Sequence, residues 1–197
     1  ASDWILESVQ DAAGTGIVIP QMWAQTWLSP RVRQERVTFR LRAERETILI
    51  RIDKSVKQSS VQAAVDGREA PRNFRQPGIL MVTLPPAVRG RECVLELSYT
   101  VDPPPPWLGI MREPWKSAQI EEAQPPRRVF WQLVLPADQH LLIGPPDLAS
   151  EMTMSADRWF TRPRAAFDQR QLEAWIKATP QESLPRGAKE YLYGTLS

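Results

Sequence analysis

Arg36-Val-Thr-Phe-Arg-Leu-Arg-Ala43 and Thr47-Ile-Leu-Ile-Arg-Ile52 alternate apolar and polar residues with a period of two, on either side of a short charged gap. In the first stretch Val37, Phe39 and Leu41 therefore point to one side of an extended chain, while the residues between them point to the other side. This alternation is typical of a half-buried antiparallel strand. We predict that the two stretches pair with each other as a β-hairpin.

The same pattern recurs along the chain and indicates the fold class. Residues 92–101 form the longest alternating stretch, and residues 78–84 and 129–135 are two further predicted strands. The dipeptide Asp66-Gly67 favours a tight turn, so we expect residues 61–65 and 68–70 to form a hairpin. Short strands separated by turn signals predict a mainly β protein, an antiparallel β-sandwich of the Ig-like or jelly-roll-like kind.

Three further predictions concern single elements. Pro20 interrupts residues 15–28, which predicts an edge strand followed by a second strand, because proline cannot donate to a sheet ladder. Residues 141–143 are predicted to pair with the strand at 129–135, which we expect to be central and covered on both faces. Residues 168–178 are predicted to be helical, with Asp168 as N-cap and Pro180 ending the helix.

The 197 residues divide into three predicted parts. Residues 1–14 form a helical or irregular lead-in, residues 15–165 form the sandwich, and residues 166–197 form a helical C-terminal segment that packs on one sheet. Within the sandwich, residues 102–106 contain four successive prolines and predict a stiff polyproline II spacer. Residues 107–128 lack periodicity and predict a long irregular excursion. Long Pro-rich loops are therefore part of the predicted fold.

Composition and charge exclude several classes of function. The 25 basic and 23 acidic residues give a net charge of +2, which is too small a field to attract nucleic acid. The arginines that alternate with apolar residues are interpreted as a solvated sheet face. Cys93, the single cysteine, alternates with apolar residues and is interpreted as a small core residue. No stretch is long and apolar enough to span a bilayer, and no secretory leader is visible.

The sequence predicts no catalytic residue, no cofactor and no metal site. His140 is the only histidine, which excludes a zinc site with several histidines, and no Gly-rich phosphate loop or calcium loop is present. Glu113, Glu121 and Glu122 could supply the paired carboxylates of a glycosidase, and this hydrolase is the weakest of three hypotheses. We lean towards a protein that is not an enzyme.

Tryptophan is unusually frequent, with 8 residues. Trp107 and Trp115 flank the excursion, where exposed indoles could stack on sugar rings or grip a proline-rich segment of a partner. They are the possible ligand-contacting residues, together with Trp159. The competing interpretation places five tryptophans in or at the edge of the core: Trp23, Trp27, Trp131, Trp159 and Trp175.

The layout of residues 61–67, 95–99 and 130–136 resembles uncharacterised β-sandwich ectodomains of large bacterial membrane-anchored proteins. The resemblance spans residues 61–164, rests on no chemically diagnostic motif and carries over no functional residue. It implies a periplasmic or extracellular setting, with the membrane segment outside this chain. A cytoplasmic location is the alternative. The chain begins with Ala1, so we expect it to be a piece of a longer protein.

The leading hypothesis is a non-catalytic interaction or structural domain of a larger exported or membrane-anchored bacterial protein. Its partner would be a protein or a glycan, with no nucleic acid, and it would meet a membrane only through segments outside this chain. The alternative hypothesis is a carbohydrate-binding module that uses exposed tryptophans as stacking platforms.

Overall fold

The structure, a computed structural model, describes residues 16–29, 32–102, 117–141, 148–157, 160–181, 184 and 188–195. Among these residues, the main sheet has eight strands. Their order across the sheet is β11 (Ala149–Ser150), β14 (Lys189–Gly194), β10 (Arg128–Leu135), β1 (Ile17–Leu28), β2 (Arg33–Ala43), β8 (Glu92–Val101), β4 (Gln62–Val65) and β5 (Arg68–Glu69).

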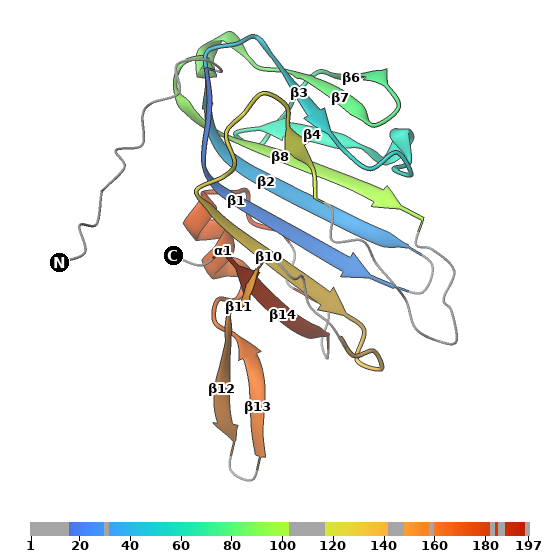
Figure 1. Cartoon of the computed structure of the whole chain (residues 1–197), viewed down its shortest axis with the longest axis vertical. Coiled ribbons are helices and arrows are strands. Elements are labelled where there is room, and N and C mark those ends of the chain that lie inside the picture. The colour runs from blue at the N-terminus through green and yellow to red at the C-terminus, as the bar shows by residue number, and fades with distance from the viewer. Residues whose placement is uncertain are drawn as a thin grey trace, which may run out of the picture.

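A second, smaller sheet lies against one face of the main sheet (Figure 1). Its order in the described part of the chain is β6 (Arg72–Gln76), β7 (Ile79–Thr83), β3 (Thr47–Arg51) and β9 (Gln119–Ile120). The core between the sheets consists of the apolar residues of each alternating strand, such as Phe39, Leu80 and Leu97. Short 3-10 turns at Gln58–Ser60 and Pro86–Val88 complete this region. The predicted mainly β sandwich is confirmed.

The hairpin predicted for residues 36–52 is wrong, although both of its strands exist. β2 pairs with β1 on one side and β8 on the other, so no free edge remains for β3. The chain instead crosses at residues 44–46 into the second sheet, where β3 pairs with β7. Alternation fixes which side chains of a strand face the core, but both sheets face the same core, so the pattern fits either sheet.

β1 is a single central strand and not the predicted edge strand followed by another. It lies between β2 and β10, and its register with β2 shifts between Val18 and Gln21, at Pro20. A bulge accommodates proline because the missing N–H falls where the ladder is already interrupted. β1 and β10 run parallel, which is an exception in an otherwise antiparallel sheet.

The other predicted strands are confirmed at β7, β8 and β10. The Asp66-Gly67 turn is also confirmed: φ is 48° at Asp66 and 75° at Gly67, and β4 pairs with β5. β10 is central as predicted, but its neighbours are β1 and β14, so the predicted pairing with residues 141–143 is wrong. Residues 142–147 themselves lie outside the described residues.

The predicted helix is α1 (Gln169–Ile176). The Asp168 carboxylate accepts a hydrogen bond from the Gln171 N–H while the Gln171 side chain accepts one from the Asp168 N–H, which forms a capping box. The helix ends before Pro180, at Lys177 in the left-handed conformation. The apolar side of α1 packs on the main sheet through Leu172 and Ile176, which contact Trp23, Phe130 and Leu192.

The C-terminal part, predicted to be helical, also contains β14, and the predicted irregular excursion contains β9. β12 (Met152–Asp157) and β13 (Phe160–Ala165) pair only with each other and project from the sandwich as a ribbon (Figure 1). The predicted lead-in 1–14 and the prolines at 103–106 lie outside the described residues. No helix in the described ranges is long and apolar enough to cross a membrane.

Candidate binding groove

The face of the main sheet that carries α1, called the outer face here, bears a row of polar side chains. Strand register places Gln62 opposite Ser98, Ser98 opposite Arg36, and Arg36 opposite Gln25. Gln25 in turn lies opposite Gln132 and donates a 2.9 Å hydrogen bond to its side-chain oxygen. Because paired positions share a face, one polar row crosses five strands.

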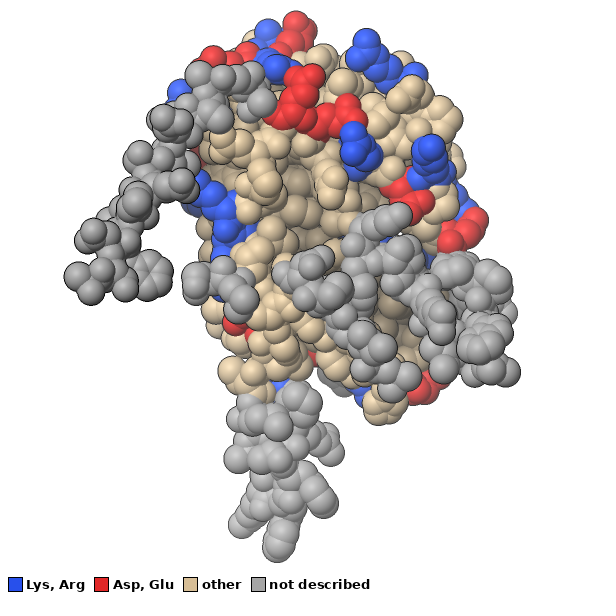
Figure 2. All heavy atoms as spheres, viewed as in Figure 1, with Lys and Arg blue, Asp and Glu red and all other residues tan. Residues whose placement is uncertain are grey.

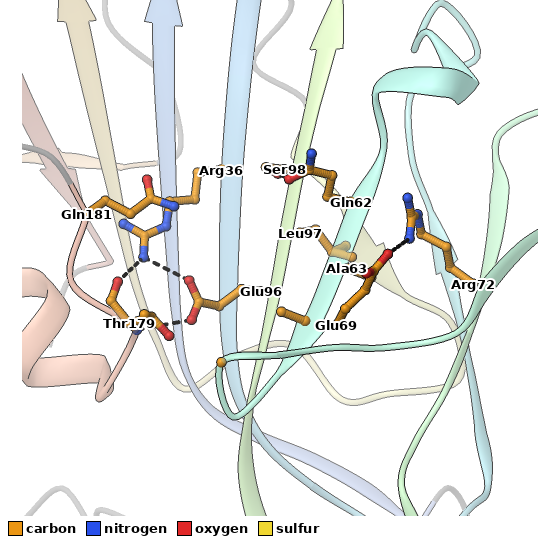
Figure 3. A pocket seen from close by; sticks show the side chains of 12 residues that line it. Arg36, Gln62, Ala63, Glu69, Arg72, Glu96, Leu97, Ser98, Thr179 and Gln181 are labelled. Atoms are coloured by element: carbon orange, nitrogen blue, oxygen red, sulfur yellow. Dashed lines mark hydrogen bonds and ion pairs between the residues drawn. The ribbon is translucent and has the colours of Figure 1, made fainter.

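Arg36 is the centre of a buried ionic cluster on this face. Its two terminal nitrogens lie 2.8 Å from Glu96 Oε2 and 3.0 Å from Glu173 Oε1, and its side chain is only 6% exposed. The guanidinium also donates to the Thr179 carbonyl at 2.7 Å and lies 4.9 Å from the centre of the Trp23 ring. Figure 3 shows Arg36 held between Glu96 and Thr179. The cluster joins β2, β8 and α1.

The same carboxylates fix the segment that follows α1. Glu96 Oε1 accepts a 3.0 Å hydrogen bond from the Thr179 N–H, and Glu173 Oε1 accepts one of 3.1 Å from the Gln181 N–H. Gln169 also donates to Glu173 Oε1, at 2.9 Å. Side chains from two strands and the helix therefore hold residues 179–181 in place as a wall beside the sheet.

Two adjoining depressions lie along this wall, with volumes of about 390 and 480 Å³. They share four lining residues, Arg36, Gln62, Ser98 and Gln181, so they form one continuous feature that we call the outer-face groove. One end reaches the turn at Gly67. The other end reaches a second set of residues from β1, β2, β8 and the turn before β4: Trp27, Gln34, Ser60 and Thr100.

The charged residues of the groove are paired with one another. Arg36 binds Glu96, and Glu69 lies 3.0 Å from Arg72 at the rim (Figure 3). Basic and acidic side chains are likewise interspersed on the face of the molecule shown in Figure 2. The groups left to meet a ligand are mainly amides and hydroxyls, which donate and accept hydrogen bonds without carrying charge.

A third depression, of about 890 Å³, lies at the second sheet and is lined by Arg51, Asp53, Lys54 and Glu121 among others. It borders Ser117, which adjoins the undescribed residues 103–116. Arg51 and Glu121 form a 3.0 Å ion pair across it, with the Arg51 side chain 65% exposed. The outer-face groove is better defined, because described residues form its floor and its wall.

Two groups near the groove have shifted pKa values. Burial raises the pKa of Glu190, and a 3.0 Å hydrogen bond from Gln132 partly offsets this effect. Burial also raises the pKa of the Tyr99 hydroxyl, as does the charge of Glu35. Glu35 is buried in the sandwich interior, where Arg33 and the Thr26 hydroxyl contact its carboxylate.

The residues predicted to contact a ligand, Trp107, Trp115 and Trp159, lie outside the described residues, as does Glu113. The structure therefore does not bring any of them to the groove. Trp23 and Trp131 are buried, as the core interpretation predicts, and Trp175 packs edge-on against Phe130 with 4.8 Å between ring centres.

The candidate acid and base residues are not brought together either. Glu121 pairs with Arg51 and Glu122 pairs with Arg45, so the adjacent carboxylates bind different arginines. His140 Nε2 lies 3.0 Å from Lys189 Nζ at the surface. Among the described residues, no group of three histidine, cysteine or acidic side chains is placed to hold a metal ion.

The sequence interpretation missed the groove because it placed the arginines of β2 on a solvated face. For Arg36 this interpretation is wrong: the residue is only 5% exposed. One signal was available in α1, where Glu173 stands between Leu172 and Ile176 on the apolar side of the helix. An acidic residue in such a position needs a buried cationic partner.

No protein-family model and no curated protein matches this sequence. Solved structures to which this chain is similar include the E323A mutant of an M1 zinc metallopeptidase from Deinococcus radiodurans with a Tyr-Ser-Ala substrate bound, at 13% identity and a TM-score of 0.47. Another crystal structure of the M1 zinc metallopeptidase from this organism is similar at 13% identity and a TM-score of 0.46. Each match covers 91% of this chain and 39% of the peptidase.

Native yeast LTA4 hydrolase is similar at 11% identity and a TM-score of 0.45, over 92% of this chain and 29% of the hydrolase. The chain thus spans about a third of the length of these proteins. Because their TM-scores are below 0.5, these likenesses carry no argument about this chain.

Proposed function

We propose that this chain is a non-catalytic interaction domain, a β-sandwich module of a larger exported or membrane-anchored bacterial protein. The observation that carries the proposal is the outer-face groove, whose floor is formed by the paired strands β2, β8 and β4. Glutamine, serine and threonine side chains line much of it. These groups recognise a ligand by hydrogen bonds and do not exchange protons near neutral pH, so they suit binding better than acid–base chemistry.

The contacts made by the charged residues in and beside the groove indicate that these residues have a structural role. Glu96 and Glu173 each bind the Arg36 guanidinium and a backbone N–H of residues 179–181. A general acid or base must be able to reach a substrate proton with its own lone pair or proton. Here those lone pairs hold the wall in place.

Rigidity supports the same proposal. The floor is fixed by strand register and the wall by the Arg36 cluster, so little conformational entropy remains to be lost when a partner binds. A domain of this kind contributes a preformed surface to a larger protein.

The exported or membrane-anchored setting is the second part of the proposal and rests on the resemblance of residues 61–164 to bacterial ectodomains. Alkaline phosphatase fused after this domain in the full-length gene should be active, because the enzyme needs an oxidising compartment to form its disulfides. An inactive fusion of normal abundance would place the domain in the cytoplasm.

Photo-crosslinking tests the interaction. Benzoylphenylalanine replaces Gln62 in the groove or, as the matched control, Asn73 on β6 of the second sheet; both positions are exposed. In cells that produce the full-length protein, we expect irradiation to give a discrete adduct from position 62 and none from position 73. Adducts of equal yield from both positions, or from position 73 alone, would contradict the groove as the interaction surface.

A carbohydrate-binding module is the second candidate function. The tryptophans predicted to form its platforms, Trp107, Trp115 and Trp159, lie outside the described residues. The observation that now favours this candidate is a different tryptophan, Trp27, at one end of the groove.

A further inference from the structure

The Trp27 end of the groove combines one indole with uncharged polar groups. Trp27 is half-buried on the outer face, and strand register places it opposite Gln34, which in turn lies opposite Thr100. Ser98 and Gln62 continue the polar surface towards the middle of the groove. An aromatic ring is therefore followed along the floor by two primary amides and two hydroxyls.

This set of groups matches the chemistry of a sugar. A pyranose ring has an apolar C–H face that packs on an indole, and neighbouring hydroxyls that each need a donor and an acceptor. A glutamine amide offers both, through its NH₂ and its carbonyl oxygen. Gln34 and Gln62 are exposed, and the Ser98 hydroxyl donates a long 3.5 Å hydrogen bond to Gln62 Oε1, which leaves the Gln62 NH₂ group to meet a ligand.

The charge of the groove selects against anionic ligands. Arg36 carries one positive charge and is bound by two carboxylates, those of Glu96 and Glu173. Arg72 at the rim is paired with Glu69, so neither of the basic residues that line the described groove is left to bind an anion. A phosphate or a uronic acid would find no unpaired cation here, whereas a neutral sugar needs none.

The shape of the groove favours a chain over a single sugar. The two depressions of about 390 and 480 Å³ meet at Gln62 and Ser98 and extend in opposite directions, towards Gly67 and towards Trp27. Each is of the size that small ligands occupy. A linear ligand can follow the floor across β4, β8 and β2.

We propose that the outer-face groove binds a neutral oligosaccharide chain, with one sugar stacked on Trp27 and its neighbours hydrogen-bonded by Gln34 and Gln62. The assignment rests on the proposed function and names its ligand class. No covalent step is involved, and the sugar leaves the groove unchanged.

The test is a titration of the isotope-labelled chain, followed by amide NMR. The probes are cellohexaose, xylohexaose and chitohexaose as neutral chains, hexagalacturonate as an anionic chain of equal length, and a proline-rich peptide. We expect at least one neutral chain to shift the signals of Gln34, Gln62 and Ser98, and hexagalacturonate to bind more weakly or not at all.

Variants then locate the binding energy. We expect Gln34→Ala and Gln62→Ala each to weaken binding about three- to tenfold, the equivalent of one hydrogen bond. Trp27→Ala should weaken it roughly tenfold or more. Asn73→Ala, an exposed amide on the second sheet, is the matched control and should leave binding unchanged. Because Gln34 and Gln62 are exposed, their variants keep the test valid even where Trp27→Ala fails to fold.

Four results would overturn the assignment. If no neutral chain shifts the groove signals at millimolar concentration, or if hexagalacturonate binds more tightly than the neutral chains, the ligand is not a neutral glycan. If the peptide shifts these signals and no sugar does, the glycan is wrong and the interaction domain stands. If the shifts caused by every binding probe fall on the second sheet alone, both proposals fail.

Discussion

Arg36 connects the main sheet to α1 and to the wall of the groove. It alternates with the core residues of β2, yet its side chain is 6% exposed and contacts two carboxylates, a carbonyl and an indole ring. Burying a charge is costly unless it is paired and hydrogen-bonded, and here each charged partner also bonds a backbone N–H. Arg36 therefore fixes residues 179–181 against the sheet.

Replacing Arg36 by Met should destabilise the protein by about 3 kcal/mol or more, because Glu96 and Glu173 would keep their charges in a buried site without a cation. Urea unfolding at neutral pH measures the change. Arg51→Met is the control: that ion pair is exposed, and its loss should cost no more than about 1 kcal/mol. Adding Glu173→Gln to Arg36→Met should recover part of the loss. Equal effects of the two arginine substitutions would show that the Arg36 cluster is not structural.

Cys93 is a core residue, as the sequence predicts, and is 3% exposed. Burial raises the pKa of its thiol from 9.0 to about 11, and the carboxylates of Asp66 and Glu92 add to the effect. The folded chain therefore holds this proton more tightly than the unfolded chain. The more tightly held thiol proton stabilises the folded chain fully below pH 9.0, and this stabilisation is lost as the pH rises towards about 11.

We expect the free energy of unfolding of the natural chain to fall between these pH values by more than that of Cys93→Ala. Urea unfolding at both ends of the range measures the difference. Tyr99, whose pKa is also raised, is present in both proteins and cancels in the comparison. Parallel pH profiles for the two proteins would mean that the thiol does not titrate differently in the folded state.

At the scale of elements, alternation predicted the strands well and their partners poorly. The pattern of residues 92–101 gives the core side of β8, since Leu95, Leu97 and Tyr99 all face the second sheet. The failed 36–52 hairpin shows the limit: a period of two reports which side is buried and says nothing about which edge is occupied. Turn residues indicate which strands pair with each other, and Asp66-Gly67 correctly predicted that the strands on either side of it form a hairpin.

The groove was harder to predict than the fold. Its floor joins Trp27, Gln34, Gln62 and Ser98 from four separate strands, and its wall comes from a segment that ends at Gln181. None of these residues belongs to a local motif. Their proximity follows from the strand order, which composition and spacing do not contain.

The turn between β4 and β5 bears on the groove directly. A Cβ added at Gly67 would lie 3.0 Å from Thr179 Oγ1, and φ there is +75°. At Gly90, where φ is +70°, an added Cβ would meet no atom within 4 Å. The two glycines are alike in conformation and differ in their surroundings, so they form a matched pair.

Gly90→Ala should cost about 1 kcal/mol, the strain of a left-handed alanine. Gly67→Ala should cost more, because it also displaces Thr179 and the wall of the groove. Chemical denaturation of both variants measures the difference, and NMR shifts at Thr179 and Gln181 report the displacement. A Gly67→Ala variant as stable as Gly90→Ala would show that the turn and the wall are not in tight contact.

At the scale of the whole molecule, the described chain is built in layers: the second sheet, the main sheet and α1 (Figure 1). The sheets bury one apolar core, and α1 covers a second, smaller cluster around Trp23 and Phe130. The ribbon of β12 and β13 stands outside these layers.

Replacing residues 154–163 of the ribbon by a short Gly-Ser turn should leave the rest folded, because a two-stranded ribbon adds little stability of its own. The variant keeps Met152 and Ala165, which pack against the apolar cluster between α1 and the main sheet. We expect one cooperative thermal transition with a midpoint within a few degrees of that of the natural chain. A large drop, or a second transition, would make the ribbon part of the core. The same variant lacks Trp159 and should still bind the oligosaccharide.

Hydrogen exchange of the full-length protein, with and without the partner that it binds in its own cells, tests the central claim most directly. The claim is that a groove on the outer face of the main sheet receives the partner. We expect the amides of β4 and of residues 178–181 to exchange more slowly in the complex, with β6 and β7 unchanged. Slower exchange confined to β6 and β7, with β4 and residues 178–181 unaffected, would contradict the claim.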